Sequence, residues 1–197
     1  MVLNILQVGD PILRQIAQEV QKEDITSQKI KDYIADMKET MYAAPGVGLA
    51  ATQVGIPLQI IVIEDCEKYL STLPSEIRKE RERYPVPFHV IINPKITVTS
   101  EENAFFFEGC LSVNGCARIT PRAKSVRVEC LDENGNEKII HANGWYARIL
   151  QHEIDHLMGK LFIDRSDKRT EIGMNEYSKK WLNASAKEIQ DFLQNHV

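Results

Sequence analysis

The chain has 197 residues, of which 43% are hydrophobic and 26% are charged, and its formal net charge is −4. This composition is typical of a water-soluble globular protein, and the length suffices for one domain with its own hydrophobic core. The negative net charge argues against a direct nucleic-acid site, and no apolar run approaches the length of a membrane span, so we expect no membrane contact.

Two helices are predicted in the N-terminal part. Asp10-Pro11 predicts the start of a short helix, because aspartate caps a helix and proline suits its first turn. A longer helix is predicted from Ser27 to Ala43 by an apolar stripe with spacings of 4, 3 and 4, made of Ile30, Ile34, Met37 and Met41. Ala44-Pro45-Gly46 should end this helix.

The next segment, Gly46 to Gln53, is rich in glycine and alanine and leaves the backbone with little side-chain cover. Such a backbone lets a ligand or another part of the chain approach closely. The segment has neither the glycine spacing nor the lysine of a phosphate-binding loop, so we do not expect a nucleotide. Taken alone, it is interpreted as a turn between a helix and a strand.

Most of the remaining chain predicts strands. Apolar or alternating runs predict them at 59–63, 88–93, 96–99, 104–107, 125–131 and 138–141, with a hairpin turn at Asn134-Gly135. The polar segment 65–87 is predicted to be a solvated insertion with some helix. Ser185-Ala186-Lys187-Glu188 has the pattern of a capping box that opens a C-terminal helix. We expect an α+β fold in one domain, with antiparallel strands around a buried helix from Gly144 to Met158.

That buried helix carries the sequence HExxH. Asn143 is its predicted N-cap and Gly159 its predicted stop. His152 and His156 are one turn apart on the same face, so both imidazoles can bind one metal ion. Glu153 lies about 100° further round the helix, close enough to act on a water without being a ligand.

A pair of histidines one turn apart can also be an ordinary feature of a helix surface. Here, Trp145 and Ile149 continue the histidine stripe, which makes the face largely apolar. Imidazoles on an apolar face need polar partners, and one metal ion serves both. We therefore predict a metal site and look for its third ligand.

The residues alone leave several choices for this third ligand. A third histidine three residues beyond Gly159 is ruled out, because Phe162 stands there. Glu176 has the spacing found in thermolysin-like peptidases. Cys110 and Cys116 together would close a structural zinc site, whereas Cys110 alone would leave an open, catalytic position. Cys110 follows Gly109 directly after a predicted strand, where the backbone can turn the thiol outward.

Three segments resemble, in the same order, the three signature motifs of peptide deformylases: Gly46 to Gln53, Glu108 to Ser112 (EGCLS) and His152 to Gly159 (HEIDHLMG). The stretch Asn143 to Arg148 and the insertion 65–87 resemble the organellar-type branch of that family. The resemblance extends from Ile5 to Asp164, and residues 1–197 would form one deformylase-like catalytic domain. Asn114 departs from the family pattern, which often has proline there.

This resemblance implies an enzyme that removes the N-formyl group from the N-terminal formyl-methionine of newly made polypeptides. Cys110, His152 and His156 would hold one divalent metal ion, with Fe²⁺ preferred and Zn²⁺, Ni²⁺ or Co²⁺ able to replace it. A metal-bound water would attack the formyl carbonyl, with Glu153 as general base. The Gln53 amide and the Leu111 backbone N–H would stabilise the oxyanion.

The resemblance also implies the substrate contacts and the setting of the enzyme. The substrate site would consist of Val47, Gly48, Glu108, Gly109, Trp145 and Ile149, with the last two beside the methionine side chain. The substrates would be ribosome-associated N-formyl-methionyl nascent peptides, and the organellar-type features suggest a homodimer. Four cysteines are too few for a disulfide scaffold and favour a reducing compartment. Since no targeting peptide is visible at the N-terminus, we expect the bacterial cytoplasm, with a processed mitochondrial or chloroplast protein as the alternative.

Overall fold

The structure, a computed structural model, describes residues 1–44 and 46–196. Its strands form a five-stranded antiparallel sheet in the order β1-β2-β3-β6-β7 and a three-stranded sheet in the order β4-β5-β8. The first sheet comprises β1 (Gly48–Ala50), β2 (Ile60–Asp65), β3 (Val86–Val98), β6 (Ser125–Leu131) and β7 (Glu137–Asn143). The second comprises β4 (Asn103–Cys110), β5 (Val113–Ala123) and β8 (Ile172–Gly173).

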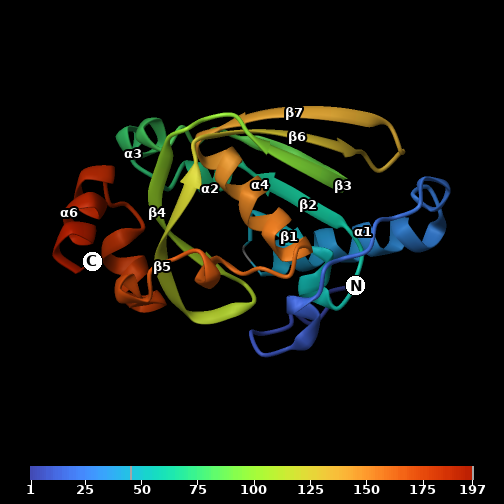
Figure 1. Ribbon diagram of the computed structural model, residues 1–197, viewed down its shortest axis with the longest axis horizontal. Helices are drawn as coiled ribbons and strands as arrows, with labels where there is room; N and C mark the ends of the chain where they lie inside the picture. Colours follow the sequence, from blue (N-terminus) through green and yellow to red (C-terminus); the bar gives the residue numbers. More distant parts are fainter. Residues whose placement is uncertain (45, 197) are drawn as a thin grey trace.

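The helices surround these sheets, except for one that lies between them. They are α1 (Gln28–Ala43), α2 (Glu67–Leu70), α3 (Ser75–Glu80), α4 (Gly144–Leu157), α5 (Met174–Glu176) and α6 (Ala186–His196). Short 3-10 turns lie at Pro11–Arg14, Lys22–Asp24, Ala51–Val54, Phe162–Asp164 and Lys168–Thr170, and a π turn at Tyr177–Trp181. Figure 1 shows α4 between the large sheet and the β4–β5 hairpin, and α6 beside β4. The predicted α+β class is confirmed.

Helix α4 occupies the centre because its apolar side chains pack on the large sheet. Ala147, Leu150, Ile154 and Leu157 belong to one buried cluster with residues of that sheet. The helix begins with Gly144, whose φ of 56° favours glycine, and a Cβ there would lie 2.3 Å from the Cβ of Glu82. It ends at Leu157, and the predicted stop, Gly159, follows the C-cap Met158 with a φ of 69°. Both ends of the helix that carries the HExxH sequence are therefore set by glycines.

Helix α1 covers the opposite face of the large sheet. Ser27, predicted as its first residue, is its N-cap, and Ile30, Met37 and Met41 join a second buried cluster with β2 and β3. Pro45, part of the predicted end of this helix, lies outside the described residues. The two clusters bury both faces of β2, which explains its continuous apolar sequence.

The structure differs from the sequence prediction in β3. Two strands were expected on either side of Pro94, but Val86–Val98 is one strand with a register shift between Ile92 and Lys95. Asn93 adopts a left-handed φ of 51° at this point, and its side chain bonds to both the N–H and the C=O of Val20 at 2.9 and 2.8 Å. The interruption is therefore a bulge stabilised by a distant backbone segment.

The insertion 65–87 is more buried than its charge suggests. It contains α2 and α3, but Leu70, Ile77 and Arg81 are buried. The buried Asp65 carboxylate accepts two hydrogen bonds from Arg83 at 2.7 and 3.0 Å. The prediction of a solvated segment was therefore wrong for these side chains, because the insertion packs against the rest of the molecule.

The C-terminal capping box is confirmed. Ser185 Oγ accepts a hydrogen bond from the Glu188 N–H at 3.2 Å, and Glu188 accepts one from the Ser185 N–H at 2.8 Å. Across residues 1–44 and 46–196, no helix combines the length and the apolar character that a membrane crossing needs.

Candidate metal centre and substrate cavity

Three potential metal ligands converge where the β4–β5 hairpin meets α4. Cys110 is the last residue of β4 and pairs with Val113, so a tight turn places its thiol beside the helix. The ligand atoms of Cys110, His152 and His156 all lie within 4.8 Å of one another, and Cys110 Sγ is 3.3 Å from His156 Nε2. Thus one strand end and one helix face supply the whole group.

The chemistry of this group fits a divalent transition metal. A thiolate and two imidazoles are a ligand set used for zinc and iron. Burial lowers the pKa of His156 well below its usual range, which favours the neutral, ligating form. Burial also tends to lower the pKa of His152, but the neighbouring Cys110 and Glu108 outweigh it and raise this pKa well above the usual range.

The other proposed third ligands lie elsewhere. Cys116 is on β5 opposite Gly173, and Glu176 is exposed on α5. Within the described parts of the chain, neither joins the group formed by Cys110, His152 and His156. The geometry therefore favours the open three-ligand arrangement over the peptidase and the closed zinc site.

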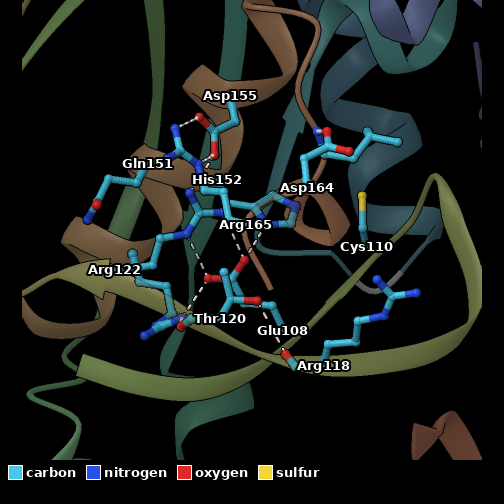
Figure 2. A network of polar contacts seen from close by, with 12 residues as sticks. Glu108, Cys110, Arg118, Thr120, Arg122, Gln151, His152, Asp155, Asp164 and Arg165 are labelled. Carbon is cyan, nitrogen blue, oxygen red and sulfur yellow. Dashed lines mark hydrogen bonds and ion pairs between the residues drawn. The ribbon is translucent and has the colours of Figure 1, made fainter. Parts of the chain in front are cut away.

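Glu108 links the first histidine to a buried ionic network (Figure 2). Its carboxylate accepts two hydrogen bonds from Arg122 at 3.0 and 2.9 Å and one from Arg148 at 2.6 Å, and lies 3.0 Å from His152 Nδ1. Burial alone would raise the pKa of Glu108, but the two arginines and His152 hold it well below its usual range. The ionised carboxylate can therefore fix the orientation of the His152 ring.

The network continues through Asp155, the second acidic residue of the HExxH segment. Asp155 accepts hydrogen bonds from Arg122 and from Arg165. Arg148 also donates to the carbonyls of Thr120 and Ala104 at 2.9 and 2.7 Å. Glu108 and Asp155 lay within recognised motifs, and Arg148 within the recognised stretch Asn143 to Arg148. Sequence reasoning did not identify Arg122 and Arg165, because they stand on separate elements without a local pattern.

Glu153 faces the other side of the group. Its carboxylate is buried against Gly48, where a Cβ would lie 2.5 Å from Glu153 Oε1. Its second oxygen, Oε2, has no hydrogen-bond partner among the described residues. Burial raises the pKa of Glu153 to about 7, although His152 acts in the opposite direction. A carboxylate with this pKa can both take up and release a proton near neutral pH.

Gln53 and Leu111 border the same group. Gln53 Oε1 accepts a hydrogen bond from the Ala50 N–H at 2.8 Å, so the amide NH₂ is directed toward Cys110 Sγ at 3.6 Å and Ser112 Oγ at 3.2 Å. The Leu111 carbonyl accepts a hydrogen bond from Gln7 at 2.9 Å, which holds the hairpin turn in place. The Gln53 amide thus lies beside the group as a possible hydrogen-bond donor to a substrate, and Gln7 holds the turn that contains Leu111.

A cavity of about 430 Å³ opens onto these residues. The Trp145 ring lines this cavity and makes an edge contact with Phe106 at 5.8 Å between ring centroids. His156 is buried beneath the lining. The other residues predicted for the site all line the cavity: Val47, Gly48, Gln53, Glu108, Gly109, Cys110, Leu111, Trp145, Ile149, His152 and Glu153.

Comparison with known proteins agrees with this arrangement. Residues 2–171 match the family model described as Polypeptide deformylase. The chain is 47% identical to chloroplastic peptide deformylase 1A of Solanum lycopersicum over 85% of its own length and 60% of that protein. It is 45% identical to the chloroplastic/mitochondrial peptide deformylase 1A of Arabidopsis thaliana over 84% of its length and 62% of the relative. The chain therefore spans less than two thirds of these two relatives.

A solved structure gives the same result at the level of the fold. The Met-Ala-Ser-bound class I type b peptide deformylase of Acinetobacter baumannii superposes with a TM-score of 0.74 at 32% identity, covering 84% of this chain and 98% of that one. The family match spans the glycine-rich segment, the end of β4 and the HExxH helix, which together surround the cavity. The chain belongs to the polypeptide deformylase family.

Proposed function

We propose that this protein is a metal-dependent hydrolase that removes the N-formyl group from the N-terminal formyl-methionine of newly made polypeptides. The observation that carries this proposal is the Cys110, His152 and His156 group at a cavity that also contains the buried carboxylate of Glu153. Membership of the family supports the same substrate and reaction. The proposed catalytic domain extends over residues 1–197.

Cys110, His152 and His156 would hold one divalent metal ion. We propose Fe²⁺ as this ion, with Zn²⁺, Ni²⁺ or Co²⁺ as substitutes. Such an ion would lower the pKa of a bound water to about 7 and polarise a carbonyl group. Glu108 would keep the His152 ring in the ligating orientation through its contact with Nδ1.

The proton transfers are assigned to Glu153. Its carboxylate would take a proton from the attacking water and pass it to the nitrogen of the leaving amine. Its pKa of about 7, raised by burial, suits a group that must accept and then release a proton. Gly48 keeps the space next to Glu153 Oε1 free of a side chain.

Negative charge that develops on the formyl oxygen would be stabilised by the Gln53 amide and the Leu111 N–H. The hydrogen bond from Ala50 fixes which end of the Gln53 amide faces the group, so no rotation is needed during the reaction. Loss of one such donor typically costs about 2.7–4 kcal/mol of transition-state stabilisation.

The substrate would bind along the glycine-rich segment. Val47 and Gly48 would pair with the peptide through their backbones, and Gly109 and Glu108 would border its other side. The methionine side chain would enter the slot beside Trp145 and Ile149. The Met-Ala-Ser named for the Acinetobacter baumannii structure has the sequence that a deformylated substrate would have.

The setting of the enzyme forms part of the same proposal. The substrates would be nascent peptides at the ribosome, and the active form would be a homodimer, as the organellar-type features suggest. Relatives include chloroplastic, mitochondrial and bacterial forms. We propose the bacterial cytoplasm as the compartment, with a processed organellar protein as the alternative; sedimentation analysis tests the dimer.

The proposed activity is tested by metal analysis together with a deformylation assay on formyl-Met-Ala-Ser. The assay is run without oxygen, because a thiolate-ligated Fe²⁺ site is sensitive to oxidation. We expect Cys110→Ala to lose both metal and activity, and Cys116→Ser and Glu176→Gln to keep both. Loss of metal in Glu176→Gln would favour a peptidase-type site, and loss in Cys116→Ser a closed zinc site.

A further inference from the structure

The segment after Glu171 lies beyond the family match, yet it reaches the cavity. Strand β8 pairs with β5 through Gly173 and Cys116, and the following residue, Met174, reaches Gly109. The Met174 sulfur lies 3.5 Å from the position that a Cβ on Gly109 would occupy. Because Gly109 precedes the ligand Cys110, the C-terminal segment (residues 172–196) starts directly beside the proposed metal site.

Three side chains of the C-terminal segment, Met174, Tyr177 and Leu182, line the cavity. The segment is anchored from behind by Trp181, which is only 5% exposed and lies 5.2 Å from the Phe107 ring and 4.8 Å from the Phe192 ring. Figure 1 shows this segment packed beside β4. The lining residues therefore stand on a fixed support.

Tyr177 and Trp145 both line the cavity, and both pack against the buried cluster that contains Phe107 and Trp181. The guanidinium groups of three arginines lie 5.3, 5.0 and 5.7 Å from the centre of the Trp145 ring, and they belong to Arg81, Arg83 and Arg148. Burial raises the pKa of Tyr177, and the same three arginines act in the opposite direction.

The C-terminal segment also leaves apolar surface uncovered in the cavity. Met174 is 37% exposed and Leu182 is 36% exposed, although both line a cavity rather than a flat surface. An apolar side chain entering between them and the two aromatic rings would remove this surface from water. A methionine suits such a slot because it is unbranched and its sulfur makes favourable contacts with aromatic rings.

We infer that Tyr177 and Leu182, together with Trp145, enclose the first side chain of the substrate, so that the C-terminal segment determines specificity. This inference rests on the proposed deformylase activity and adds residues from beyond the family match to its substrate slot. Tyr177 closes the slot beside Trp145, and Leu182 sets how far a side chain can extend.

The test measures kcat/KM for formyl-Met-Ala-Ser and for its formyl-Leu and formyl-Phe counterparts. Tyr177→Ala and Leu182→Ala should change the ratios among these substrates in favour of the bulkier formyl-Phe peptide, by roughly tenfold or more for Tyr177→Ala. Metal content should stay at the wild-type level. Leu182 is partly exposed, so its variant should fold even if the loss of Tyr177 destabilises the segment.

Matched controls come from the same segment. Phe192 packs on Phe107 as Tyr177 does, and Leu193 packs against the buried cluster that contains Phe107. Neither Phe192 nor Leu193 lines the cavity. Phe192→Ala and Leu193→Ala should lower the melting temperature and leave the substrate ratios unchanged.

The outcomes separate this inference from the proposed function. Unchanged ratios in both Tyr177→Ala and Leu182→Ala, with an active wild-type protein, would overturn the inference alone. Equal changes in the control variants would also overturn it, because the segment would then act only through stability. A wild-type protein that carries metal but does not deformylate formyl-Met-Ala-Ser would overturn the proposed function and this inference with it.

Discussion

Two sides of the cavity are built in different ways. One side is the segment 46–53, which presents backbone and small side chains; we call it the glycine side. The other side consists of β4, β5 and α4, whose charged residues pair with one another while buried; we call it the ionic side. Its members are Glu108, Arg122, Arg148 and Asp155.

The two sides are sensitive to opposite kinds of change. On the glycine side, a Cβ added to Gly48 would lie 2.5 Å from Glu153 Oε1, so a side chain has no room there. On the ionic side, each charge is matched by a partner, so a removed charge leaves another one buried and unpaired. The metal site is thus enclosed by close packing on one side and by charge balance on the other.

Glu153 touches both sides, since it stands on α4 and packs on Gly48. Glu153→Gln keeps the shape of the side chain but removes its basicity. We expect turnover to fall by about 10²–10⁴-fold, the usual contribution of a general base, while metal content stays unchanged. Single-turnover kinetics on formyl-Met-Ala-Ser, with metal analysis, measures this. Near wild-type turnover would show that Glu153 is not the base.

Glu108→Gln tests the ionic side. The substitution leaves Arg122 and Arg148 without their shared carboxylate, and the free energy of unfolding should fall by about 3–5 kcal/mol. Metal affinity should also fall, by roughly 10–100-fold, because His152 loses the group that orients it. Denaturant unfolding and metal titration measure the two effects.

The control for this change is Glu171→Gln, which breaks the pair with Arg118, where Glu171 is substantially exposed. An exposed pair contributes at most about 1 kcal/mol. Equal losses of stability in both variants would contradict the idea that burial makes the ionic side sensitive.

The sequence predicted the parts of the site that depend on local patterns. The HExxH spacing, the stop at Gly159 and the capping box at Ser185 are all decided within a few residues, and each has the predicted geometry. The apolar run of β2 likewise predicted a buried strand. The choice of Cys110 as third ligand depended on the resemblance to a family, because its contact with α4 spans 46 residues.

The ion pairs of the ionic side were missed for the same reason. Arg122 is 14 residues from Glu108 and 33 from Asp155, and no spacing rule connects them. Charged residues are also expected at the surface, so Asp65 and Arg81 in the insertion were assigned to solvent although both are buried. The bulge in β3 likewise depends on Val20, 73 residues from Asn93.

Gly48→Ala tests the glycine side. The backbone there has no positive φ, so the added methyl group acts only through its contact with the Glu153 carboxylate, 2.5 Å away. We expect the free energy of unfolding to fall by about 1–3 kcal/mol, as in other overpacked sites, together with a loss of activity. Gly109→Ala is the matched control for stability, because its nearest neighbour, Met174, lies at an ordinary 3.5 Å. Equal effects would show that the glycine side is not closely packed.

The smallest expected effect concerns pH and again separates the two sides. The folded state holds the pKa of Glu108 well below that of an ordinary glutamate, so its carboxylate stabilises the fold above the unfolded pKa, about 4.3. This contribution should fade as the pH falls below that value toward the folded pKa, because the unfolded chain takes up the proton first.

The difference in unfolding free energy between the wild-type protein and Glu108→Gln should therefore be constant near neutral pH and shrink in acid. Gly48→Ala leaves Glu108 in place and acts on Glu153, whose pKa burial raises to about 7, so any change with pH in its difference from the wild type should fall near neutral pH and not in the acid range. Chemical denaturation of the three proteins at a series of pH values measures both differences; a wild-type to Glu108→Gln difference that does not change with pH would mean that the charge of Glu108 is not what stabilises the ionic side.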